Sequence, residues 1–131
     1  MMEIELLESL FRDHGWCEET CYPELRGRWS PGCPEFGQCA VTSLVVQDIL
    51  GGDIVKCTHM HHYFNVVGGV VIDLTKSQWG EGESLVCIDR RADRTKMLLG
   101  NGSGSAETLR RYLLLKRRTM WAISFKDNTN D

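Results

Sequence analysis

The sequence predicts a small α+β domain in which one buried helix packs against an antiparallel β-sheet. Residues 38–50 carry apolar side chains at the spacing of one helical face, and glycines precede and follow this segment. Residues 62–67 and 70–74 are strand-like runs, and Gly68-Gly69 between them suits the positive φ angles of a tight hairpin turn. A helix followed by paired strands, with further helices on either side, is typical of the α+β class.

Length and composition indicate one globular unit. The 131 residues fit a single domain, which we expect to span residues 1–125, with 126–131 as a frayed tail. No apolar run approaches the roughly 20 residues of a membrane span. The first residues lack the basic-then-apolar layout of a secretion signal, so we expect a cytoplasmic protein with free thiols at its six cysteines.

The N-terminal third predicts one helix and an irregular connection. Apolar residues recur at near-helical spacing in residues 3–12, and Gly15 is expected to end that helix. Residues 16–37 are rich in Pro, Gly, Trp and Cys, which favours an ordered segment without regular structure. Trp16 and Trp29 are its expected anchors.

The central helix is expected to begin near Gln38 and to end at Gly51-Gly52. Its apolar residues form one stripe and indicate that the helix is buried: Val41, Leu44, Val45 and Ile49.

The remaining segments predict strands and one more helix. Residues 53–58 suit a strand before the hairpin, and residues 84–88 suit another after it. Residues 100–105 (GNGSGS) are predicted to be a loop that leads into a helix over 106–116. Residues 120–125 are predicted to be a closing strand.

Cys39 lies at the predicted start of the central helix, where two physical effects favour reactivity. The partial positive charge of a helix N-terminus stabilises a thiolate. The unpaired N–H groups of the first turn can also receive an oxyanion during acyl transfer. The alternative is a cysteine that only packs in the core.

The hairpin register brings a histidine and an aspartate together. With a two-residue turn, Val67 pairs with Val70, and Phe64 comes to lie opposite Asp73. His62 and Asp73 are then diagonal neighbours on one face of the sheet. A cysteine nucleophile needs a base to remove its proton and a carboxylate to orient that base, so the sequence predicts a site of Cys39, His62 and Asp73.

The stretch WSPGCPEFGQCAVTSLVVQDILGGDIVK, with the later HYFN, VIDLT and RRYLLL, resembles the YunG-like family of small bacterial proteins from about residue 16 to 118. The pattern is more distantly similar to papain-like cysteine hydrolases, including bacteriocin-processing peptidases and the transglutaminase-like group. That resemblance implies a papain-like core, with Cys39 as nucleophile, His62 as base and Asp73 as the orienting acid.

The sequence departs from the papain pattern at the oxyanion glutamine. Cys33 stands near the place where such enzymes carry it, and Gln38 is adjacent to the nucleophile instead. Gln38, Gln47 and Trp79 are therefore the candidates for oxyanion or pocket residues.

Two other functions remain open. Cys57, His59 and His61 alternate along one strand and form a weaker candidate for a zinc site. Residues 66–131 hold eleven basic and eight acidic residues, against four and ten in residues 1–65. This basic half is compatible with a non-catalytic binding module on a papain-like scaffold, although solvated helix faces and internal ion pairs are the better explanation of the charge.

The sequence thus predicts a cysteine-dependent hydrolase or acyl-transfer enzyme that cleaves an amide or peptide bond and needs no cofactor. The expected partner is an amide- or ester-containing substrate, a protein among the options. Membrane and nucleic-acid partners are not expected.

Overall fold

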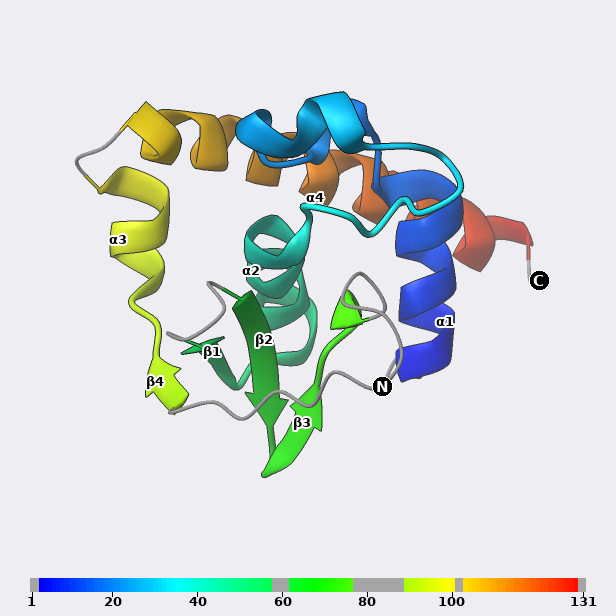
Figure 1. Cartoon of the computed structure of the whole chain (residues 1–131). Coiled ribbons are helices and arrows are strands. Elements are labelled where there is room, and N and C mark those ends of the chain that lie inside the picture. Colours follow the sequence, from blue (N-terminus) through cyan, green and yellow to red (C-terminus); the bar gives the residue numbers. More distant parts are fainter. Residues whose placement is uncertain (1–2, 58–61, 77–88, 101–102, 130–131) are drawn as a thin grey trace.

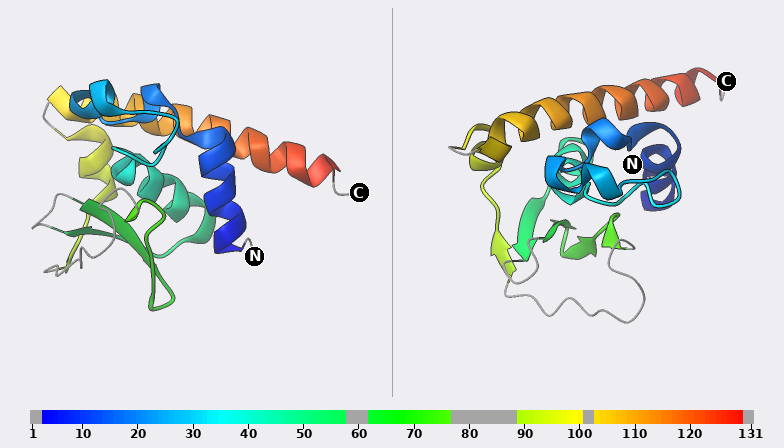
Figure 2. Two further views of the ribbon diagram at one scale, coloured as in Figure 1. Left: turned by 45° about the vertical axis from the view of Figure 1, so that its right-hand side comes forward. Right: turned by 45° about the horizontal axis from the view of Figure 1, so that its top comes forward.

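The central helix α2 (Cys39–Leu50) lies between a small β-sheet and the long C-terminal helix α4 (Ser103–Thr129) (Figure 1). The computed structural model describes residues 3–57, 62–76, 89–100 and 103–129. Two further views show α4 and the sheet on opposite sides of α2 (Figure 2). The predicted α+β class is confirmed.

The sheet has four antiparallel strands in the order β3-β2-β1-β4. The predicted strand before the hairpin is β1 (Asp53–Cys57), and the hairpin consists of β2 (His62–Val67) and β3 (Val70–Ile72). The edge strand β4 (Asp89–Arg91) pairs with β1 and was not predicted. The strand expected at 84–88 lies outside the described residues.

The core forms on both sides of α2, as its apolar stripe predicts. Val41, Leu44 and Val45 are fully buried. They belong to one cluster with Ile54 of β1, and with Leu115 of α4. Because the sheet and α4 both pack on α2, this helix joins the two layers of the fold.

The N-terminal segment packs over the start of α2. Helix α1 (Ile4–Leu10) continues as a π-helical turn to Gly15, and short 3₁₀ turns follow at Glu18–Thr20 and Pro23–Arg28. Trp16 is buried, and its indole Nε1 donates a 2.8 Å hydrogen bond to Thr42 Oγ1 in α2. The anchoring role predicted for Trp16 is confirmed.

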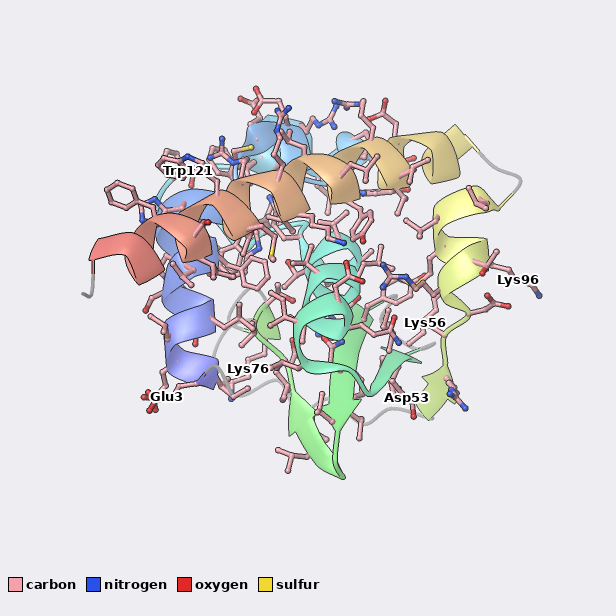
Figure 3. The ribbon with its side chains drawn as sticks, turned by 180° about the vertical axis from the view of Figure 1, so that it is seen from behind. Glu3, Asp53, Lys56, Lys76, Lys96 and Trp121 are labelled. Atoms are coloured by element: carbon pink, nitrogen blue, oxygen red, sulfur yellow. The ribbon has the colours of Figure 1, made fainter. Side chains whose placement is uncertain are left out.

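The prediction for the C-terminal segment was wrong. Residues predicted as part of a loop (103–105), as a strand (120–125) and as part of a tail (126–129) all belong to the single helix α4. The buried residues of this helix lie on one face: Arg111, Tyr112, Leu115, Thr119 and Ala122. Trp121 and Phe125 are 62% and 58% exposed and stack on each other one helical turn apart. Figure 3 shows Trp121 beside α4.

A polar network joins α2, α4 and the short helix α3 (Arg94–Leu99). Asp48 of α2 accepts from Arg94 Nη2 at 2.8 Å and from Lys116 Nζ at 3.1 Å. Tyr112 donates its hydroxyl proton to the same carboxylate. Part of the basic charge of the C-terminal half is therefore paired inside the fold. Among the described residues, no helix is both long enough and apolar enough to cross a bilayer.

Leu115→Ala should lower the free energy of unfolding by about 2–5 kcal/mol, because it leaves a cavity between α4 and α2. Leu113→Ala is the matched control, since it makes the same change on the same helix at a side chain that is 53% exposed. It should change the unfolding free energy by less than about 0.5 kcal/mol. Urea denaturation of both variants measures the difference, and equal effects would contradict the packing of α4 described above.

Candidate active site

Cys39 is the first residue of α2, as predicted, and its thiol is free and partly exposed. The first helical hydrogen bond runs from Thr42 N to Gln38 O at 3.0 Å. The N–H groups of Cys39 and the two residues after it therefore have no carbonyl of the preceding helical turn to bind. Gln38 makes no side-chain cap, so the thiol lies beside a helix N-terminus whose first N–H groups have no acceptor within the helix.

Gly37 shapes the turn that leads into this helix. Its φ is +72°, in the region that favours glycine, and a Cβ there would lie 2.5 Å from Cys21 Sγ. Its carbonyl accepts from Tyr22 N at 2.9 Å. The turn therefore requires glycine both for its conformation and for its close packing against Cys21.

The hairpin register is confirmed. Val67 pairs with Val70, and Asn65 pairs with Ile72. Strand β3 ends at Ile72, so Asp73 follows directly and meets the first residue of β2. His62 Nε2 and Asp73 Oδ2 are 2.6 Å apart.

This His–Asp pair is almost completely enclosed. The side chains of His62 and Asp73 are 0% and 7% exposed. The imidazole stacks on Phe64 with ring centroids 6.2 Å apart. The second carboxylate oxygen, Asp73 Oδ1, accepts from Thr75 N at 3.3 Å. Both partners of the pair are thereby held in orientation by their neighbours.

Cys39 completes the cluster. Burial opposes a positive charge on His62, but hydrogen bonds with the Asp73 carboxylate and the Cys39 sulfur outweigh it and raise the pKa of His62 to about 9. The structure therefore brings together the three residues that the sequence predicted: a helix-start thiol, an imidazole and a carboxylate.

Tyr63 belongs to the same neighbourhood and was not predicted. Burial raises the pKa of its hydroxyl, and a negative charge on Cys39 raises it further. Lys56, opposite it on β1, lies over the Tyr63 ring at 5.5 Å. The alternation of side chains along β2 was the available signal, because it places Tyr63 on the opposite face from Phe64 and therefore toward α2.

The pocket candidates lie in different places. Gln38 is fully buried, and its Nε2 donates to Cys17 O at 3.0 Å. Gln47 Nε2 donates to Gly52 O at 3.0 Å, about 12 Å along the helix from Cys39. The structure does not bring Gln47 to the thiol, and Trp79 lies outside the described residues.

The zinc candidate changes because Cys57 is disulfide-bonded. This corrects the expectation that all six cysteines are free thiols, and it removes Cys57 as a thiolate ligand. His59 and His61 lie outside the described residues. Within the residues that the structure does describe, no three His, Cys, Asp or Glu side chains are grouped to hold a metal ion.

Cys33 occupies an environment opposite to that of Cys39. Its Sγ donates to Glu35 Oε1 at 3.1 Å. Burial, the hydrogen bond to Glu35 and the negative charge of that carboxylate raise the pKa of Cys33 to about 11. Its thiol therefore stays protonated at neutral pH.

Comparison with known proteins identifies the family. The family model described as YunG protein matches residues 3–123. The chain belongs to the YunG family. A relative from Bacillus subtilis (strain 168), named "Uncharacterized protein YunG", is 44% identical over 54 residues, which cover 40% of this chain and 47% of the relative. The match thus spans about half the length of that YunG protein. No solved structure matches the chain.

The buried pair predicts a pH-dependent stability for this YunG-family protein. The pKa of His62 in the fold, about 9, is higher than its ordinary value of 6.5. The pair therefore stabilises the fold fully below about pH 6.5, and this contribution disappears as the pH rises through about 9. Asp73→Asn should lower the melting temperature by roughly 5–10 °C near pH 6, and by clearly less near pH 10.

Asp53→Asn is the matched control for this measurement. Asp53 pairs with Arg91 at 2.9 Å, but the two side chains are 45% and 80% exposed. Its loss should change the melting temperature by no more than about 2 °C at either pH. Calorimetry across this pH range would contradict the assignment if the Asp73→Asn deficit did not shrink toward high pH.

Proposed function

We propose that this protein is a cysteine-dependent hydrolase or acyl-transfer enzyme that acts on an amide or ester bond through Cys39, His62 and Asp73. The observation that carries the proposal is the buried imidazole of His62, which is bonded both to Asp73 at 2.6 Å and to the thiol at the start of α2. A purely structural histidine needs neither a partly exposed thiol nor a helix N-terminus beside it.

In the proposed resting state, the imidazole of His62 already holds the proton of the Cys39 thiol, because its pKa of about 9 keeps it charged at neutral pH. Because Nε2 binds Asp73, Nδ1 is the ring nitrogen that carries this proton. The thiolate attacks the carbonyl carbon of the substrate, and a C–S bond forms while the carbonyl π electrons move to oxygen. The unused N–H groups of the first turn of α2 bind this oxyanion.

The intermediate then collapses to a thioester. The C–N or C–O bond of the substrate breaks, and the imidazolium of His62 gives its proton to the leaving amine or alcohol. Water or an amine then attacks the thioester carbonyl as His62 takes its proton. The C–S bond breaks, the acid or amide product leaves, and the proton on His62 is again shared with the Cys39 sulfur. Asp73 holds the imidazole in the correct tautomer and stabilises its charged form throughout.

The proposal includes a distant papain-like relationship. Its support is the arrangement of a helix-start cysteine on a helix that packs against an antiparallel sheet. The chain differs at the oxyanion glutamine, because Cys33 binds Glu35 and Gln38 Nε2 donates to Cys17 O. In this proposal the backbone N–H groups of α2 stabilise the oxyanion without a glutamine side chain.

The alternative is a binding module that uses the basic C-terminal half. Arg94 is paired with Asp48, and Arg118 Nε donates to Gly15 O at 2.7 Å. Arg110 and Arg117 of α4 are exposed and line one shallow cavity with Leu113. Since much of the basic charge is used inside the fold, we prefer the catalytic function.

Alkylation of the free cysteines by iodoacetamide, followed by peptide-resolved mass spectrometry, tests the proposal. Near pH 7, Cys39 should react at least about tenfold faster than Cys33, because an adjacent base and a helix N-terminus favour its thiolate. His62→Ala should remove this advantage. His14→Ala is the matched control, since His14 lies exposed against Trp121, and it should leave the rate unchanged.

Turnover is tested with an activated ester such as p-nitrophenyl acetate. Cys39→Ala should abolish acyl-enzyme formation and hydrolysis. The proposal fails if Cys39 alkylates no faster than Cys33, or if His62→Ala changes nothing. Salt-sensitive binding of a polyanion that survives Cys39→Ala would favour the binding module instead.

A further inference from the structure

Arg111 of α4 is a buried arginine next to the start of α2. It is only 1% exposed, although it lies in a run of basic residues. Its Nε donates to Thr20 O at 3.0 Å, and its Nη2 donates to Gly37 O at 3.2 Å. Gly37 is two residues before Cys39, so this guanidinium holds the turn from which the nucleophile helix begins.

In the described part of the chain, no carboxylate forms an ion pair with this guanidinium. Among the described residues, its contacts are the two carbonyls and the ring of Tyr22, which lies 5.7 Å from its central carbon. Burying an arginine without a carboxylate is costly, and proteins rarely do so without a reason. Hydrogen bonds to these carbonyl groups do not by themselves require a charged side chain, because an uncharged amide side chain could donate the same kind of bond.

The titratable and charged groups that face Arg111 are few. They are Cys21 and Cys39, which favour its charge, Arg26, which opposes it, and Glu107, which favours it. Glu107 already binds Arg110 at 2.7 Å and Arg26 at 3.2 Å. The charge of Arg111 therefore acts mainly on the two thiols.

Cys21 and Cys39 respond to this charge in different ways. Cys21 is fully buried, and burial raises the pKa of its thiol in spite of Arg111. Cys39 is partly exposed and already has His62 as a proton acceptor. Of these two thiols, Cys39 is therefore the one that a reagent or substrate can reach.

We propose that Arg111 is a positioning residue for the Cys39 site: its buried guanidinium fixes the turn at Gly37 and supplies the positive charge that stabilises the Cys39 thiolate from the side of α4. This inference rests on the proposed function of Cys39. It adds that the nucleophile is activated from both sides, by His62 on the sheet and by Arg111 on the helix layer. Burial lowers the pKa of Arg111 to about 10, so its charge is present throughout the neutral range.

The test is the pH profile of Cys39 alkylation in Arg111→Gln, which keeps an amide donor for Gly37 O and removes the charge. At about pH 6.5 the rate should fall about tenfold, because two charges several ångströms apart in a partly buried site change a thiolate population by that order. At about pH 10, where the thiolate forms without assistance, the rate should match that of the wild type. A merely structural role would lower the rate equally at both pH values.

Two further variants separate charge from position. Arg118→Gln removes the same charge and a similar carbonyl bond from the same helix, since Arg118 Nε binds Gly15 O, and it should leave the profile unchanged. Arg111→Lys keeps the charge and should stay within about threefold of the wild-type rate at about pH 6.5. If Arg111→Gln does not fold, Arg111→Lys decides alone, because a tenfold loss in a folded lysine variant would overturn the role of the charge.

The alkylation rate of Cys39 in the wild type is measured first, because it tests the proposed function separately from the role of Arg111. If wild-type Cys39 reacts no faster than Cys33, the proposed function fails before Arg111 is considered. If wild-type Cys39 is activated, and Arg111→Gln keeps the wild-type profile, the proposed function stands and the role of Arg111 is overturned.

Discussion

The register of the β2–β3 hairpin is the constraint on which both the core and the candidate site depend. Gly68 and Gly69 have φ angles of 56° and 79°, so a two-residue turn fixes which residues face each other. On one face, Asn65 Nδ2 binds Ser43 O of α2 at 2.9 Å, and Ile72 opposite it enters the core. His62, the first residue of β2, meets Asp73 just beyond the end of β3. A slip of one residue would exchange the two faces and remove the helix contact and the His–Asp pair together.

The start of α2 is fixed by bonds from two other parts of the chain. Trp16 donates to Thr42, and Gln38 donates to Cys17 O, which tie the N-terminal segment to the first turn. Arg111 then ties α4 to Gly37 O. Since the sheet fixes His62 independently, the distance between thiol and imidazole is set by two separate sets of contacts. The N-terminal segment and α4 are therefore both needed to hold the first turn of α2 in place.

The predictable parts of the structure are those that depend on residues close together in the sequence. The apolar stripe of α2 and its flanking glycines predict the helix and place Cys39 at its start. The hairpin turn predicts the strand register, which brings His62 and Asp73 together. The error at 120–125 arose because Trp121 and Phe125 resemble a strand when read locally, whereas the buried phase of Tyr112, Leu115, Thr119 and Ala122 continues through them. Arg111 lies one turn before Leu115 and is buried as well. Neither this burial nor the disulfide at Cys57 follows from local spacing, because each depends on residues distant in the sequence.

The environments of Cys33 and Cys39 show how the charge asymmetry of the chain is used. Cys33 faces Glu35, an acid of the N-terminal half, and its thiol is held protonated. Cys39, six residues later, is hydrogen-bonded to His62, and the guanidinium of Arg111 binds Gly37 O two residues before it. The turn at Gly37, which has a φ of +72°, lies between the two cysteines in the sequence. Two chemically identical side chains thus lie in different electrostatic surroundings, one beside a carboxylate and the other beside an imidazole.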